Sequence, residues 1–122
     1  MTLDELAAYA LGKPGAWPDI PWEDDRVAKV GPGAAGAKIF AFLGDGAVGV
    51  KCGTGRDGPA DEWLDRYPDD ASVMAYIGRS GWNDLAFGGA IPDDELLEAV
   101  DESYRLVCGG LAKKLQPEGW AD

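Results

Sequence analysis

Apolar residues near the N-terminus recur at the spacing of one helix face, which predicts an amphipathic helix over residues 2–11. Thr2 and Glu5 are spaced as a capping box, in which each side chain bonds a backbone N–H at the helix start. Gly12 and Pro14 end the pattern. The apolar positions of this helix are Leu3, Leu6, Ala7, Ala10 and Leu11.

The same helical period returns in the last third of the chain and predicts a long helix from Asp93 to Leu115. Gly109 and Gly110 are expected to weaken or bend it, since each glycine costs roughly 1 kcal/mol in a helix interior. The tail after residue 115 is expected to fray. The apolar stripe consists of Leu96, Leu97, Val100, Tyr104, Val107, Cys108, Leu111 and Leu115.

Between these helices, short apolar runs bounded by turn residues predict strands. Residues 38–52 are the clearest, because two strand runs flank the turn cluster Gly44-Asp45-Gly46 and so predict a β-hairpin. Alternation places one set of side chains on each face, and both sets contain apolar members, so each face is expected to be partly covered. One set is Lys38, Phe40 and Phe42, and the other is Ile39, Ala41 and Leu43.

The remaining elements complete the predicted architecture. Pro59 opens a short helix that runs to Tyr67 and stops at Pro68. We expect an α+β fold in one domain, residues 1–122, with an antiparallel sheet built from hairpins and the N- and C-terminal helices packed on one face. Further strands are predicted at residues 17–22, 26–30, 72–77 and 82–87, with an acidic turn at residues 23–25.

Charge and composition narrow the classes of function. The chain carries 22 acidic and 11 basic residues and no histidine, a net charge of −11, so its mean field repels a polyanion such as DNA. The absence of histidine removes the commonest general base and metal ligand. Cys52 and Cys108 are isolated and are expected to be reduced and packed. The N-terminus carries acids where a secretory signal carries bases, so we expect a cytoplasmic protein.

Sequence motifs for catalysis are weak. Residues 31–36 fit the dinucleotide pattern G-x-G-x-x-G, but a predicted strand follows where the phosphate-binding helix is required, which favours a hairpin loop. No serine or cysteine has a histidine to activate it, and paired carboxylates arise by chance among so many acids. We therefore expect a protein without enzymatic activity, catalytic residues, cofactor or metal.

Two surface patterns have alternative interpretations. An acidic ridge on the last helix is typical of a solvated face, and alternatively of a weak divalent-cation site or a surface for a basic partner. Lys38, Phe40 and Phe42 form either a basic-aromatic platform that stacks single-stranded bases or a half-buried core face with a snorkelling lysine. The ridge consists of Asp94, Glu98, Asp101 and Glu102.

Seven short motifs also occur in order along the chain. They are Pro14-Gly15-Ala16, Pro21-Trp22, Lys38-Ile39-Phe40-Ala41, Val50-Lys51-Cys52, YIGRSGW at residues 76–82, Ile91-Pro92-Asp93 and Ser103-Tyr104. From about Leu3 to Leu115 this ordered set resembles the YjbR/MmcQ family of small bacterial proteins. The resemblance implies a CyaY-like fold, also described as a double-wing motif, and a DNA-binding label that rests on the fold, with no catalytic residues.

The resemblance also favours a shared structural turn at residues 76–82, with Trp82 entering the core beside Tyr76. Arg79 in this turn is available to anchor an anionic group or the acidic last helix. Nucleic acid is thus the nominal partner, although the net charge opposes it. The alternative is a protein-interaction or small-ligand module that uses the Trp82 turn or an apolar sheet face; a cation-binding ridge is a third hypothesis. The candidate nucleic-acid or anion-binding residues are Lys29, Lys38, Lys51, Arg79 and Trp82.

Overall fold

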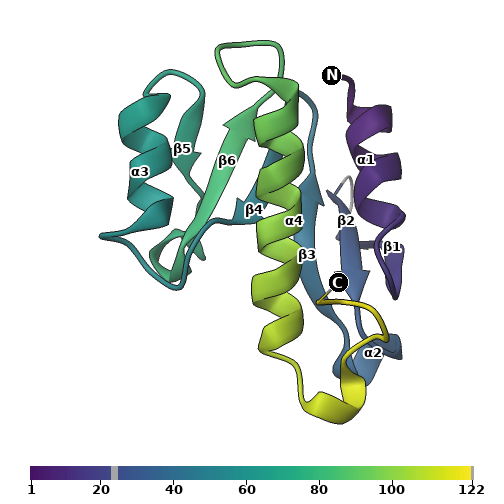
Figure 1. The fold of residues 1–122 in the computed structure, drawn as a ribbon. Coiled ribbons are helices and arrows are strands. Elements are labelled where there is room, and N and C mark those ends of the chain that lie inside the picture. The colour runs from purple at the N-terminus through teal and green to yellow at the C-terminus, as the bar shows by residue number, and fades with distance from the viewer. Residues whose placement is uncertain (23–24, 122) are drawn as a thin grey trace.

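A computed structural model describes residues 1–22 and 25–121, so residues 23 and 24 of the predicted acidic turn lie outside the described residues. Helices lie on one face of an antiparallel six-stranded sheet (Figure 1), which confirms the predicted α+β fold. The strands, in their order across the sheet, are β1 (Ala16–Trp22), β2 (Asp25–Val30), β3 (Lys38–Leu43), β4 (Ala47–Lys51), β6 (Trp82–Ala86) and β5 (Ala71–Val73). The helices are α1 (Leu3–Leu11), α2 (Gly33–Gly36), α3 (Pro59–Arg66) and α4 (Asp93–Gly109), with 3₁₀ turns η1 (Gly78–Ser80) and η2 (Lys113–Leu115).

The N-terminal helix forms as its sequence predicts. The Thr2 hydroxyl accepts a hydrogen bond from the Glu5 N–H, and the Glu5 carboxylate accepts one from the Thr2 N–H. This capping box satisfies two backbone donors that have no partner inside the helix. Leu6, Ala7 and Ala10 of α1 are buried against the sheet, as the apolar period requires. Among the described residues, no helix has the length and apolarity of a membrane span.

The C-terminal helix is shorter than predicted. It ends at Gly109, and Gly110 caps it, because the glycine pair stops the helix where the sequence predicted a bend. The tail from residue 116, predicted to fray, instead lies against the body of the protein. The Gln116 side-chain amide donates hydrogen bonds to the backbone carbonyls of Cys108 and Leu111, at 3.1 and 3.2 Å, and Trp120 packs near Gly109.

The main core lies between the sheet and α1 and α4. Phe40 and Tyr104 meet edge to face there, with ring centroids 5.2 Å apart. The Tyr104 hydroxyl donates a hydrogen bond to the Pro14 carbonyl, which ties α4 to the segment after α1. The fully buried side chains of this layer include Leu6, Val30, Phe40, Val48, Val50, Leu85, Leu96 and Val100.

A β-bulge in β3 changes which face its aromatic side chains occupy. Ala28 of β2 pairs with Ala41, whereas the next residue, Lys29, pairs with Ile39, so Phe40 is an extra residue in the ladder. Phe40 therefore packs on Tyr104 in the core, whereas Phe42 contacts Trp82 on the opposite, open face of the sheet, at 5.6 Å between ring centroids. The prediction that Lys38, Phe40 and Phe42 share one face is wrong.

Two other local predictions need correction. The strand predicted at residues 72–77 is β5 at Ala71–Val73, and after Met74 the chain leaves the sheet in a turn over residues 75–77. Tyr76 has a φ of 66° and is fully exposed, so it does not accompany Trp82 into the core as expected. The loop predicted at residues 31–36 contains the single turn α2 before β3 begins.

Candidate functional site

A groove lies on the open face of the sheet, opposite α1 and α4, with a volume of about 810 Å³. Phe42, Ala47, Gly49 and Asp84 form its floor on β3, β4 and β6. Residues 74–77, which follow β5, also line it. Trp22 and Asp25, with the hairpin turn at Gly44 and Asp45, complete the lining. We call this the open-face groove.

The floor of the groove stays close to the strand backbone at Gly49, because this residue has no side chain. A Cβ at Gly49 would lie 2.8 Å from the Met74 sulfur and 3.1 Å from the Phe42 Cβ, so any other residue would displace one of them. Met74 lies over the strand at this point, and its backbone N–H donates to the Trp82 carbonyl. A glycine in the middle of a strand costs stability, and at Gly49 it lets the Met74 side chain approach the strand closely.

Two large aromatic side chains of the groove are turned to solvent. Trp22 is 56 % exposed and Tyr76 is fully exposed, although both have large apolar surfaces. Together with Phe42 they give the groove a predominantly apolar lining. Exposed aromatic residues gathered at one concave place are typical of binding sites rather than of a solvated surface.

Asp84 is the polar group of the groove floor. It pairs with Gly49 on β4 and with Ser72 on β5, and it is only partly exposed. Burial raises the pKa of the Asp84 carboxyl, because removal from water disfavours the ionised form. Sequence analysis did not single out Asp84, since one carboxylate among 22 acids in the chain carries no local signal.

The turn at residues 78–82 is organised by Arg56, which sequence analysis did not propose as a site residue. The Arg56 guanidinium donates to the carbonyl of Gly78 at 3.0 Å and to the side-chain oxygen of Asn83 at 3.0 Å. Its Nε donates to Asp61 at 2.8 Å. Asp61 also accepts from the Asp57 N–H, and these two contacts, the backbone one foremost, lower the pKa of the Asp61 carboxyl.

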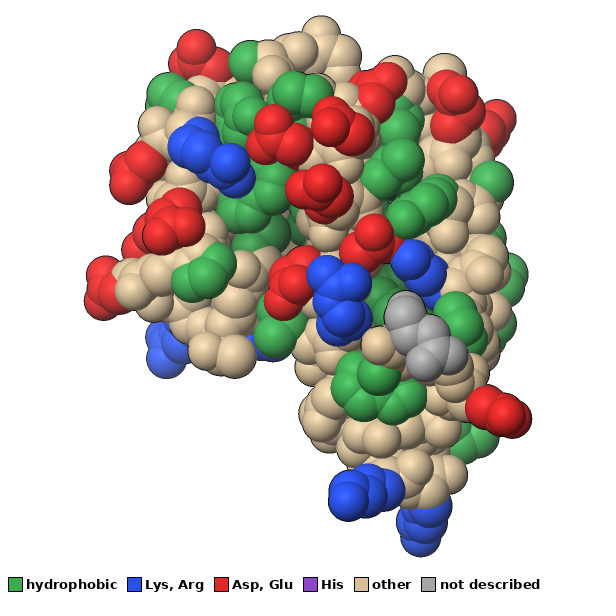
Figure 2. All heavy atoms as spheres, in the orientation of Figure 1, with side chains coloured by type: hydrophobic (Ala, Val, Ile, Leu, Met, Phe, Trp, Pro, Cys, Tyr) green, Lys and Arg blue, Asp and Glu red, His purple; other side chains and the backbone are tan. Residues whose placement is uncertain are grey.

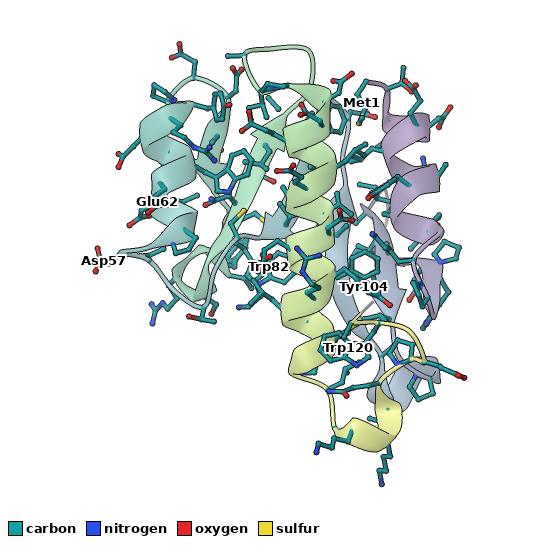
Figure 3. The ribbon with its side chains drawn as sticks, viewed as in Figure 1. Met1, Asp57, Glu62, Trp82, Tyr104 and Trp120 are labelled. Carbon is teal, nitrogen blue, oxygen red and sulfur yellow. The ribbon has the colours of Figure 1, made fainter. Side chains whose placement is uncertain are left out.

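Trp82 enters the body of the protein, as the turn hypothesis expects, and lies behind α4 in the view of Figure 3. It contacts Phe42 edge to face and is 9 % exposed. This residue therefore packs beside Phe42 on the open face of the sheet and does not offer a free stacking surface. Its role in the structure is packing.

The candidate basic residues lie on four separate elements, three strands and the turn η1. Lys29 forms an ion pair with Asp19 at 2.7 Å, and its Nζ lies 5.5 Å from the Trp17 ring centroid. Lys51 donates to the Ser80 carbonyl at 2.7 Å, and burial lowers the pKa of its ammonium group. Lys38 and Arg79 are exposed, at the start of β3 and in η1.

The acidic ridge is part of a broad acidic surface. Figure 2 shows acidic side chains gathered over α4 and α3, with a few basic ones among them and others at the end near η2. Asp101 is paired with Lys13, and Glu102 with Arg105, whereas Asp94 and Glu98 are exposed. Within the described ranges, no three Cys, Asp or Glu side chains are grouped to hold a metal ion. Two of the four ridge carboxylates thus have basic partners, and the other two face solvent.

The two cysteines are free and buried. Burial raises the pKa of the Cys52 thiol to about 11, and burial also raises that of Cys108. A thiol with a raised pKa is a poor nucleophile at neutral pH, since the thiolate is the reactive form. Neither cysteine has the environment of a reactive site.

The fold and groove define a class: α+β proteins in which one face of an antiparallel sheet carries the helices and the other remains open. The model of the YjbR family matches residues 11–106, more than half of the chain. The protein belongs to the YjbR family, as the ordered motifs indicated.

Solved structures share this fold. The crystal structure of the Deinococcus radiodurans protein DR2400, a DUF419 domain, has a TM-score of 0.80 at 20% identity, covering 93% of this chain and 84% of that one. A Pseudomonas syringae protein has a TM-score of 0.62 at 18% identity, covering 87% of this chain and 98% of its own. At such identities the likeness concerns the fold. No curated protein matches the sequence.

Proposed function

We propose that this chain is a non-enzymatic binding protein that holds a small, largely apolar ligand in the open-face groove. The observation that carries the proposal is the groove itself, in which Trp22 and Tyr76 expose aromatic surface beside the apolar floor around Phe42. Its volume of about 810 Å³ lies within the range of roughly 300–1,000 Å³ that small-molecule sites occupy.

The nucleic-acid hypothesis has weaker support. Lys29 and Lys51 would have to leave the Asp19 carboxylate and the Ser80 carbonyl to meet phosphates. The face with Phe42 is acidic at Asp25, Asp45 and Asp84, and the net charge of −11 opposes a polyanion. The basic-aromatic platform that would stack bases is divided between two faces by the bulge at Phe40.

A neutral fluorescent probe tests the proposal. N-phenyl-1-naphthylamine becomes bright in an apolar site, and we expect it to bind wild type with saturable enhancement. Trp22→Ala should weaken binding about fivefold, the equivalent of about 1 kcal/mol. Ala47→Phe, which fills the groove from its floor, should abolish binding. Ile20→Ala is the matched control, because Ile20 is 62 % exposed and lies outside the groove lining.

Equal probe binding by wild type and Ala47→Phe, with both folded by circular dichroism, would refute the groove as the binding site. The nucleic-acid alternative is measured in parallel by anisotropy of labelled single- and double-stranded DNA at 50 and 200 mM salt. We expect no binding at either salt concentration. Binding at 50 mM that falls steeply at 200 mM would instead favour DNA, because phosphate contacts release counterions.

A further inference from the structure

The open-face groove is acidic as well as aromatic. Three carboxylates line it, from Asp25, Asp45 and Asp84, and the described residues of its lining include no lysine or arginine. The groove therefore combines aromatic faces with negative charge. Aromatic faces attract cations through the ring quadrupole, and a nearby carboxylate adds a charge-assisted contact.

Asp84 differs from the other partly buried carboxylates among the described residues because it has no hydrogen-bond or ion-pair partner there. Six acidic side chains are partly buried among the described residues, and five of them have a hydrogen-bond or ion-pair partner. Asp84 alone has none among the described residues. The five partnered acids are Asp19 with Lys29, Asp61 with Arg56, Asp70 with the Ala90 N–H, Glu95 with Arg66, and Asp101 with Lys13.

The place of Asp84 makes its lack of a partner informative. It stands on the floor of an apolar groove, between two cross-strand neighbours. Gly49 has no side chain with which to cover or pair it, and Ser72 forms no hydrogen bond with it among the described residues. A carboxylate that is partly withdrawn from water without a partner costs free energy. A cation entering the groove would offset that cost and would meet the rings of Trp22 and Tyr76 on the way.

We propose, on the basis of the groove function proposed above, that the ligand is a small organic cation, an ammonium group carrying an apolar body. The ammonium group contacts the Asp84 carboxylate on the floor. The apolar body lies against Phe42 and between the exposed rings of Trp22 and Tyr76. Asp25 and Asp45 at the rim attract the cation and repel anions of the same shape.

Three soluble probes of nearly equal shape separate charge from apolar contact: phenethylammonium, 2-phenylethanol and phenylacetate. Each is titrated into the ¹⁵N-labelled full chain at 150 mM NaCl, and backbone amide shifts are followed. We expect phenethylammonium to bind at least tenfold more tightly than 2-phenylethanol, with phenylacetate weakest. The largest shifts should fall around Gly49, Ala75 and Asp84.

Asp84→Asn should reduce the affinity for phenethylammonium to that of the alcohol and leave the alcohol's affinity unchanged. Asp65→Asn is the control, because it removes the same charge from an exposed position on α3. An equal loss in both variants would overturn the inference, since general attraction to an acidic protein would then explain the preference.

The two proposals fail in different ways. If all three probes shift groove amides with equal affinity, the preference for a cation is refuted while the groove remains a binding site. If cation shifts map to α4 instead, the inference is also refuted. If no probe shifts groove amides, and the neutral fluorescent probe does not bind either, the groove function itself is refuted.

Discussion

Ser103 connects α4 to the bulge that directs Phe42 into the open-face groove. Its fully buried hydroxyl donates to the Phe40 carbonyl at 2.6 Å and accepts from the Lys51 N–H at 2.8 Å. The pairing of β3 with β4 ends at Ala41 and Val50, so the hydroxyl takes the place that a strand partner would fill for Lys51.

Ser103→Ala would leave a buried carbonyl and a buried N–H without this partner. Each unsatisfied group costs about 1–3 kcal/mol. Alanine recovers roughly 0.5 kcal/mol through its higher helix propensity. We therefore expect the free energy of unfolding to fall by about 3 kcal/mol, which for a domain of this size lowers Tm by roughly 10 °C.

Urea unfolding followed by circular dichroism and tryptophan fluorescence measures this change. Ser72→Ala is the control, because Ser72 is exposed on β5 and its side chain should matter by less than about 0.5 kcal/mol. A loss of less than about 0.5 kcal/mol in Ser103→Ala, with an unchanged m-value, would refute the reasoning. The bulge would then be held without the hydroxyl.

Three further predictions concern stability and reactivity. Burial raises the pKa of the Asp84 carboxyl, so the ionised carboxylate destabilises the folded state at neutral pH. Asp84→Asn should therefore raise Tm at pH 7. This gain should vanish at a pH low enough for aspartate to be protonated in both the folded and the unfolded state. A thermal-shift series over pH measures this, and a gain that grows toward acid would contradict it. Gly81→Ala should cost more than about 2 kcal/mol in urea unfolding, because Gly81 has a φ of 95° and a Cβ there would lie 2.2 Å from the Gly53 carbonyl oxygen. Cys52 and Cys108 should react with an aromatic disulfide reagent only at the rate of unfolding, since both thiols are buried with raised pKa; fast labelling of the native protein would refute this.

The sequence by itself determined the features that arise from local pattern. The capping box of Thr2 and Glu5 and the turn at Gly44-Asp45-Gly46 each require only neighbours along the chain, and both appear where the pattern placed them. The helical period also located the start of α4 at Asp93, although the helix ends at Gly109. The ordered motifs likewise identified the family.

Tertiary structure decided the site. The bulge at Phe40 depends on the register between β2 and β3 and on Ser103, which lies 63 residues away along the chain, so alternation within β3 could not reveal it. A bulge reverses the faces of the strand beyond it, which is why Phe42 lies in the groove and not in the core. The isolation of Asp84 likewise depends on its cross-strand neighbours Gly49 and Ser72, and spacing along the sequence does not reveal which residues pair across strands.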